Sequence, residues 1–314
     1  MGRTGLALGT VVAAAAAHRR SRGRTRRVAR EIARLDPRTA YQQIVYLSGA
    51  YDFPWDLEIA LSLALLRTFA SPSISGLLDA TGEFRDHPQK RYDDTELLLA
   101  HVLEGGWESP DGRAATRRIN AMHGAYDIPA EDMLYVLSTF VIEPLKWNAR
   151  YGWRRVTEAE REAAFQYWRH LGPWLMVRDV PATLDELWAF NADYERRNLV
   201  YADTNARVAE ATLQPTLARL PRLAHGPFRQ ALAALYEPHV RRAFGWPDPP
   251  KAVQRGVDTA LRARAVVLRG CVPERRRPYH VLDRKRPTYP AGHRVEELGT
   301  FPAVSRSRPS RQHA

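Results

Sequence analysis

The chain has 314 residues, 45% hydrophobic and 26% charged, a composition that excludes wholesale disorder and provides for a sizeable core. Its single cysteine, Cys271, excludes an internal disulfide and any metal centre built from several cysteines of this chain. The net charge of +12 lies at the two ends: residues 1–36 carry nine Arg against two acidic residues, and residues 262–314 carry thirteen Arg and Lys against four. The middle is mildly acidic, so only the ends favour a polyanionic partner such as an anionic membrane surface.

The first segment, residues 1–36, combines an apolar run with an arginine cluster. The run, residues 5–17, is shorter than the roughly 20 residues that a helix needs to cross a bilayer. The arginines follow the run, which reverses the charge order of a secretory signal peptide. We expect a candidate membrane anchor that holds the following domain on the cytoplasmic side. The alternative is a segment that contacts nothing.

Residues 37–271 follow a helical period. Asp56 is placed to cap a predicted helix over residues 57–70, and Pro72 ends that helix. A central helix is predicted over residues 131–143, because the interior of this segment carries almost no charge. Further amphipathic helices are predicted over residues 158–171, 184–197, 228–244 and 251–268.

No alternating strand pattern is present, so the prediction is all-α, with one large helical bundle-like domain over residues 37–271. The density of Pro and Arg in residues 272–314 predicts a disordered or extended tail that packs poorly.

Several enzyme classes are improbable, because the chain has no phosphate loop, no G-x-S-x-G elbow, no H-E-x-x-H and no Glu-x-x-His pair for a di-iron site. Cys271 is expected to be a buried thiol and not a heme ligand.

His123 is the most promising single residue. On a helix, Ile119, Met122, His123 and Tyr126 share one apolar face, which directs the imidazole into the core. A neutral imidazole there can ligate a metal or heme iron. The alternative is a hydrogen-bonded core histidine.

A second group lies in residues 90–96, at the start of a helix that continues to residue 103. Arg91 and Thr95 are four residues apart, so a guanidinium and a hydroxyl can meet at a pocket wall and donate hydrogen bonds to dioxygen or an oxyanion. The alternative is that Arg91 pairs with Asp93 and Asp94 of the first turn.

Five blocks of sequence resemble the catalytic domain shared by the mycophenolic-acid oxygenase MpaB and the latex-clearing rubber oxygenases, more closely the MpaB branch. The resemblance covers roughly residues 41–275 and is carried by residues 51–84, 90–96, 119–127, 132–161 and 244–250.

This resemblance implies an all-helical oxygenase that binds heme b and uses dioxygen to cleave an alkene bond in an isoprenoid-type apolar small molecule. It implies that His123 is the axial ligand of the iron, and that Arg91 and Thr95 lie on the opposite side, where they polarise dioxygen. Trp55, Phe69 and Tyr135 are candidate walls for the alkene.

One position departs from the family. Rubber oxygenases can carry a Lys directly before the Thr, able to reach the iron, whereas this chain has Asp94. An amine therefore cannot cap the iron from that position.

Two other functions compete with the oxygenase. One is a non-catalytic helical scaffold associated with a membrane through its Arg-rich ends. The other is nucleic-acid binding, which the acidic body and the lack of a recognisable binding module make unlikely.

Overall fold

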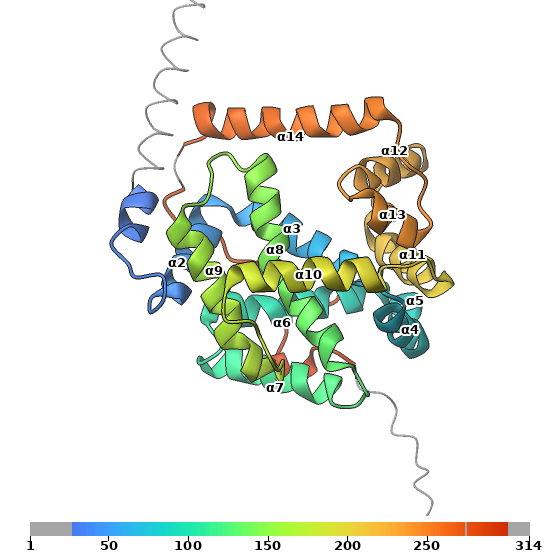
Figure 1. The fold of residues 1–314 in the computed structure, drawn as a ribbon, viewed down its shortest axis with the longest axis horizontal. Coiled ribbons are helices and arrows are strands. Elements are labelled where there is room, and N and C mark those ends of the chain that lie inside the picture. Colours follow the sequence, from blue (N-terminus) through green and yellow to red (C-terminus); the bar gives the residue numbers. More distant parts are fainter. Residues whose placement is uncertain (1–26, 274, 301–314) are drawn as a thin grey trace, which may run out of the picture.

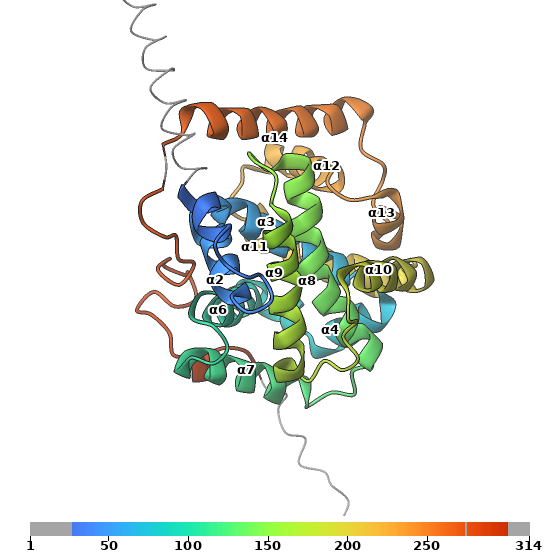
Figure 2. The same ribbon diagram turned by 60° about the vertical axis from the view of Figure 1, so that its left-hand side comes forward.

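Every regular element in the described residues, 27–273 and 275–300, of this computed structural model is a helix, which confirms the all-α prediction (Figures 1 and 2). Residues 27–32 are also helical. The named elements are α2 (Tyr41–Leu47), η1 (Ser48–Asp52), α3 (Pro54–Thr68), α4 (Pro72–Thr81), α5 (Glu83–Asp86), α6 (Pro88–Gly105), α7 (Pro110–His123), α8 (Ala130–Tyr151), α9 (Glu158–Leu171), η2 (Gly172–Leu175), α10 (Leu184–Asn198), α11 (Asp203–Leu217), α12 (Arg222–Ala233), α13 (Pro238–Phe244), α14 (Lys251–Cys271) and η3 (Val295–Glu297).

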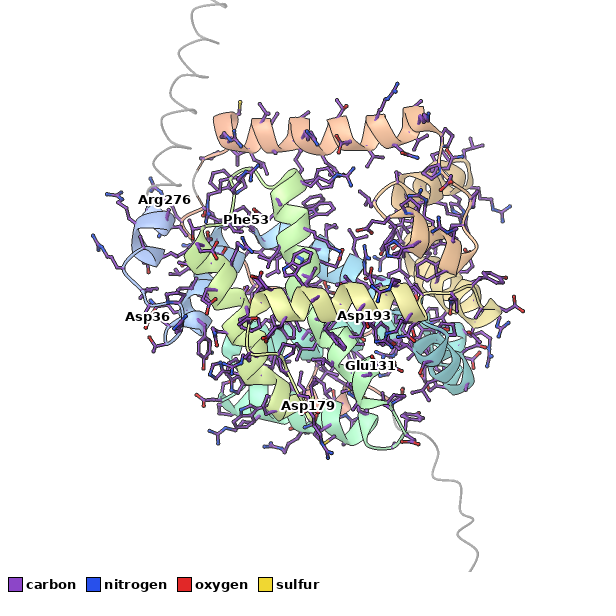
Figure 3. All side chains as sticks on the ribbon, in the orientation of Figure 1. Asp36, Phe53, Glu131, Asp179, Asp193 and Arg276 are labelled. Atoms are coloured by element: carbon purple, nitrogen blue, oxygen red, sulfur yellow. The ribbon has the colours of Figure 1, made fainter. Side chains whose placement is uncertain are left out.

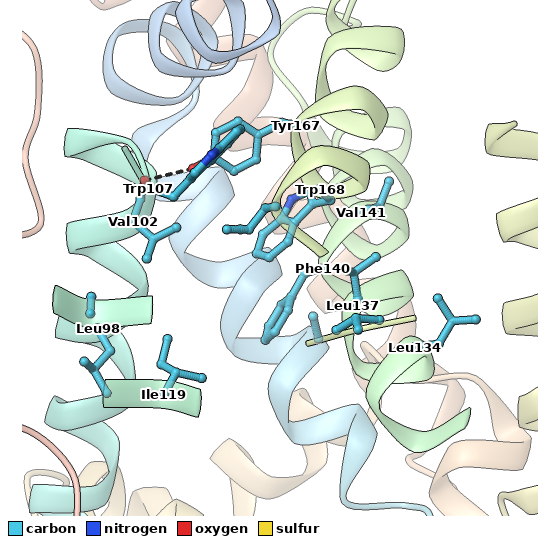
Figure 4. Close-up of a cluster of buried hydrophobic side chains, with 14 of the residues drawn as sticks. Leu98, Val102, Trp107, Ile119, Leu134, Leu137, Phe140, Val141, Tyr167 and Trp168 are labelled. Atoms are coloured by element: carbon cyan, nitrogen blue, oxygen red, sulfur yellow. Dashed lines mark hydrogen bonds between the residues drawn. The ribbon is translucent and has the colours of Figure 1, made fainter. Parts of the chain in front are cut away.

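Helix α8 passes through the middle of the molecule, as predicted, and packs on α3, α9 and α10 (Figure 2). Its apolar side chains meet those of α6, α7 and α9 in the main core, where the Tyr167 hydroxyl donates to the Val102 carbonyl at 2.8 Å (Figure 4). The helix continues past the predicted end at residue 143, through Pro144, because Trp147 beyond the proline is buried and held by other helices.

Two predicted helix starts are confirmed in detail. Thr157 and Thr183 each accept a hydrogen bond from the backbone N–H of the third residue of their helix. The carboxylates of those third residues, Glu160 and Glu186, accept one from the backbone N–H of the cap. These reciprocal bonds satisfy amide groups that the first turn of a helix leaves without partners.

The prediction that Asp56 caps a helix is wrong. Helix α3 begins at Pro54, and Asp56 lies inside its first turn, 3% exposed. Its carboxylate accepts hydrogen bonds from Trp147 Nε1 and Arg264 Nη1, both at 2.9 Å. Tertiary partners, and not the local backbone, therefore decide its role.

The predicted helix over residues 228–244 is two helices. Helix α12 already begins at Arg222 and contains Pro227, and α13 begins at Pro238. A proline is well suited to the first position of a helix, since its missing N–H has no partner there in any case. Pro238 therefore starts a new helix.

Residues 275–300 run mostly without regular structure, as predicted, but the expectation of poor packing is wrong for them. Val295 and Leu298 are buried in the main core, and the Tyr279 amide donates to the Ala50 carbonyl at 2.9 Å. We call these residues the C-terminal strap. Apolar contacts, hydrogen bonds and ion pairs such as Arg286–Glu96 together dock this Arg-rich segment.

Replacement of Leu298 by Ala is expected to lower the free energy of unfolding by about 2–5 kcal/mol, because it leaves a cavity in the core. The measurement is urea denaturation, with Leu223→Ala as a control, since Leu223 is 93% exposed. Equal stabilities for the two variants would contradict the packing of the strap.

The predicted anchor lies mostly outside the described residues, including the run 5–17 and most of the arginine cluster. Its described part packs on the body, because Val28 and Ile32 are buried against α2 and α9. Among the described helices none is both long and apolar enough to span a bilayer alone; α3 and α4 qualify only as a pair bent by 92°.

Candidate functional site

A cavity of about 610 Å³ lies between α3, α6, α11, α12 and α14. This volume is typical of small-molecule and cofactor sites, which occupy roughly 300–1,000 Å³. Its wall is mainly leucine and other apolar side chains, and Tyr279 and Val281 of the C-terminal strap complete it. The cavity therefore suits an apolar ligand.

Of the three predicted wall residues, only Trp55 lines this cavity. Phe69 is buried against Phe84, with ring centroids 5.1 Å apart, and Tyr135 is fully buried with its hydroxyl 3.2 Å from Glu195. The last two residues fill the core of the α3–α10 side and do not line this cavity, and their role as walls for the alkene stays a prediction.

Thr95 and Arg91 meet on α6, as their spacing predicts. Arg91 Nη1 donates to Thr95 Oγ1, and Thr95 Oγ1 is 2.9 Å from the Arg91 carbonyl. Thr95 also lines the cavity, whereas Arg91 stacks over Phe84, 5.0 Å from its centroid. The pair therefore joins Thr95, in the wall of the apolar cavity, to the charged guanidinium of Arg91, which lies outside that wall.

The alternative pairing of Arg91 with Asp93 and Asp94 is not what the described residues show. Asp94 is 1% exposed and bonds to Lys90 Nζ at 2.5 Å and to Tyr289 of the C-terminal strap. Burial lowers the pKa of Arg91, although Asp94 and Glu83 oppose this shift. The half-buried guanidinium thus has Thr95 as its side-chain hydrogen-bond partner.

His123 is the last residue of α7, which packs on α6. Its Nδ1 atom is buried and has no hydrogen-bond partner among the described residues. Burial, together with the charge of Arg91, lowers the pKa of His123 to about 4. The ring is therefore neutral at pH 7 and keeps a lone pair that nothing described here uses.

The helix of α7 ends at His123, so Tyr126 does not extend the predicted apolar face. Tyr126 lies in the turn that follows, near enough to affect the pKa of Arg91. Glu83, which the sequence analysis missed, has the same effect, and its Oε2 atom is buried without a hydrogen-bond partner in the described part of the chain. No sequence motif points to Glu83, because it lies on a different helix from Arg91 and helical spacing does not relate the two.

A titration is expected to show the neutral state of His123. A histidine whose folded pKa lies below 6.5 contributes stability above pH 6.5, and this contribution is lost as the pH falls toward 4. The free energy of unfolding of ligand-free protein should therefore lose at most about 3 kcal/mol from this group over that range.

The measurement is urea unfolding from pH 7 to pH 4 for the wild type and for His123→Gln. For each protein the free energy of unfolding is plotted against pH. The difference between the two slopes isolates the contribution of the histidine from that of the carboxylates, which titrate in both proteins. Identical slopes would contradict a buried neutral ring.

Cys271 is exposed, so the prediction of a buried thiol is wrong. It is the last residue of α14, a helix whose outer side faces solvent.

The fold and the cavity define an all-helical protein with an apolar cavity and, outside the cavity wall, a half-buried histidine whose Nδ1 atom has no hydrogen-bond partner among the described residues. Residues 52–269 match the family described as "ER-bound oxygenase mpaB/B'/Rubber oxygenase, catalytic domain". This match covers more than half of the chain, and the protein belongs to that family.

Curated relatives are similar to the same region. The ER-bound oxygenase mpaB' of Penicillium brevicompactum is 26% identical over 243 residues, which are 71% of this chain and 57% of the relative. The ER-bound oxygenase mpaB of Penicillium roqueforti (strain FM164) is 28% identical over 221 residues, 64% of this chain and 74% of the relative. The chain thus spans little more than half of the length of the first of these.

Proposed function

We propose that this protein is a heme b-dependent oxygenase that uses dioxygen to cleave an alkene bond in an isoprenoid-type apolar molecule. One observation carries the proposal: the buried Nδ1 of His123 has no partner, and the ring, with a pKa of about 4, is neutral. In a member of an oxygenase family, that free lone pair is available to bind heme iron.

What supports a heme held through His123 is the chemistry of its side chain. A neutral imidazole can donate its lone pair to iron, and the orphaned Nδ1 and Glu83 Oε2 atoms both lie near the charge of Arg91. Bound there, the heme would supply the redox chemistry with dioxygen. His123 does not line the cavity, which Thr95 reaches, so the cavity is assigned to the substrate.

The chain's own residues would orient the reactants. The apolar wall formed by α3, α6 and α12 would hold the hydrocarbon chain and exclude water. The Thr95 hydroxyl, which Arg91 holds in place, would present a polar group in the α6 side of the cavity wall. Insertion of both oxygen atoms of one dioxygen molecule across the double bond yields two carbonyl fragments, with no other reactant.

We also propose that the protein acts at a membrane, with its body on the cytoplasmic side. The arginine-rich ends support an anionic surface as a partner, and the two relatives carry the words "ER-bound" in their names.

The test is an absorption spectrum with iron analysis of protein purified from heme-supplied cells, followed by incubation with an isoprenoid alkene and dioxygen. A Soret band and two carbonyl products are expected. A colourless protein would favour the non-catalytic scaffold instead.

Thr95→Val is expected to lower the turnover rate by about 100-fold while the Soret band stays, because one hydrogen-bond donor to developing charge is lost and the volume is kept. Thr139→Val is the matched control and should leave turnover unchanged, because Thr139 is buried on α8, does not line the cavity, and its hydroxyl donates to the Val136 carbonyl of its own helix. Equal rates for both variants would contradict the assigned role of Thr95.

A further inference from the structure

Helix α14 lies across the outside of the molecule (Figures 1 and 2). On its inner side Val257, Ala260 and Leu261 line the cavity, yet Ala265 is the only one of its 21 residues that is buried. Ala260 and Trp55 both line the cavity and are exposed. The cavity therefore opens to the exterior beside α14.

The outer side of α14 is apolar and has no partner within the described chain. Val266 and Val267 are 66% and 53% exposed, which is unusual for adjacent valines in one helix. At 100° per residue, Ala252, Thr259 and Ala263 fall on the same side, and all are exposed. Figure 3 shows side chains of α14 that project away from the body.

One edge of this face is basic. Lys251, Arg255, Arg262 and Arg269 follow one another at spacings of four and seven residues, so they share one edge of the helix, and all four are exposed. Two members of the row also have partners in the chain: Arg262 pairs with Asp258, the only acidic residue of α14, at 2.9 Å, and Arg269 Nε donates to the Trp153 carbonyl at 2.7 Å. An apolar face beside a row of cations is typical of a helix that lies in a lipid–water interface.

We propose that the outer face of α14 docks on an anionic lipid surface, with the helix axis parallel to that surface. The cavity opening beside α14 would then lie at the lipid, from which a poorly soluble substrate can enter. A second copy of the chain fits this face less well, because a symmetric contact brings two rows of cations together. The proposal goes beyond the proposed function, and its test does not need heme.

Cys271 makes the test specific to α14, since it is the only cysteine in the sequence, is exposed, and ends the helix. The full chain is labelled there with a fluorophore whose emission shifts to the blue in an apolar environment. Vesicles of phosphatidylcholine with phosphatidylserine should produce this shift, and vesicles of phosphatidylcholine alone should bind at least about tenfold more weakly.

The double variant Val266→Asp/Val267→Asp should weaken the interaction seen by the label at least about tenfold, because charged groups enter the interface poorly. Arg255→Gln/Arg262→Gln should weaken it for the anionic vesicles only. Val200→Asp is the matched control: Val200 is also a valine, 54% exposed and outside α14, and its variant should behave as the wild type. Circular dichroism checks that all variants remain folded.

Three results would overturn the proposal. The first is an unchanged emission of the label when the protein sediments with vesicles, because the membrane contact would then lie elsewhere in the chain. The second is an undiminished shift in the double aspartate variant. The third is a shift that depends on protein concentration without vesicles, which would assign the face to a second copy.

Discussion

His123→Ala is expected to abolish the Soret band and to lower the iron content of the purified protein at least about tenfold, since loss of even a partner of a metal ligand costs about 10–100-fold in affinity. Oxygenase activity should disappear with the heme. Because the substitution leaves a space the size of the ring, added imidazole should restore part of the band.

His170→Ala is the control, since His170 is exposed on α9 and should leave the spectrum unchanged. Rescue by imidazole separates loss of a ligand from a general loss of structure. A His123→Ala protein with the wild-type spectrum would show that another residue holds the iron.

Arg67→Met is expected to destabilise the fold by about 3–5 kcal/mol, because it leaves buried carboxylates without their counter-charge. Arg67 lies on α3 and is 1% exposed. Its guanidinium contacts Glu195 at 2.9 Å and Glu143 at 3.3 Å, and also Glu237. One side chain thus joins α3 to α8, α10 and the start of α13.

The pH dependence provides the check. Burial alone would raise the pKa of Glu195, but the hydrogen bond from His239 and the charge of Arg67 lower it to about 2. A depressed pKa contributes stability above its usual value near 4.5, and this is lost as the pH falls toward 2. In Arg67→Met the carboxylates can be protonated at pH 4, so the difference from the wild type should shrink between pH 7 and pH 4.

Arg85→Met serves as the control for charge alone, since Arg85 and its partner Asp86 are largely exposed. Its unfolding midpoint should match that of the wild type. A pH-independent difference for Arg67→Met would indicate lost packing and not unpaired charge.

Much of the fold could be predicted from local patterns. Helix periodicity and the Thr157 and Thr183 caps depend on residues within a few positions of one another, and the structure agrees with them. The new helix at Pro238 has a local cause that the prediction missed, whereas the continuation of α8 past Pro144 depends on distant side chains that hold the helix beyond the proline.

The candidate site shows the same division. Helical spacing predicts that Arg91 meets Thr95, since both lie on α6. Helical periodicity also pointed to His123 as an inward-facing residue, and the resemblance to a family made it the expected axial ligand, a role that stays a prediction. The partners of Asp94, however, include Tyr289, 195 residues further along the chain, and no spacing rule connects such positions.

The sequence by itself determined the helical class, most helix starts and the oxygenase family. The class and the helix starts depend on short-range periodicity, and the family depends on sequence motifs that can be identified without the structure. Only the tertiary structure decided that Arg67 is buried among carboxylates, that His123 is neutral, and that the C-terminal strap forms part of the cavity wall. Burial and charge pairing arise from segments that are remote in sequence, and they become visible only when the helices pack.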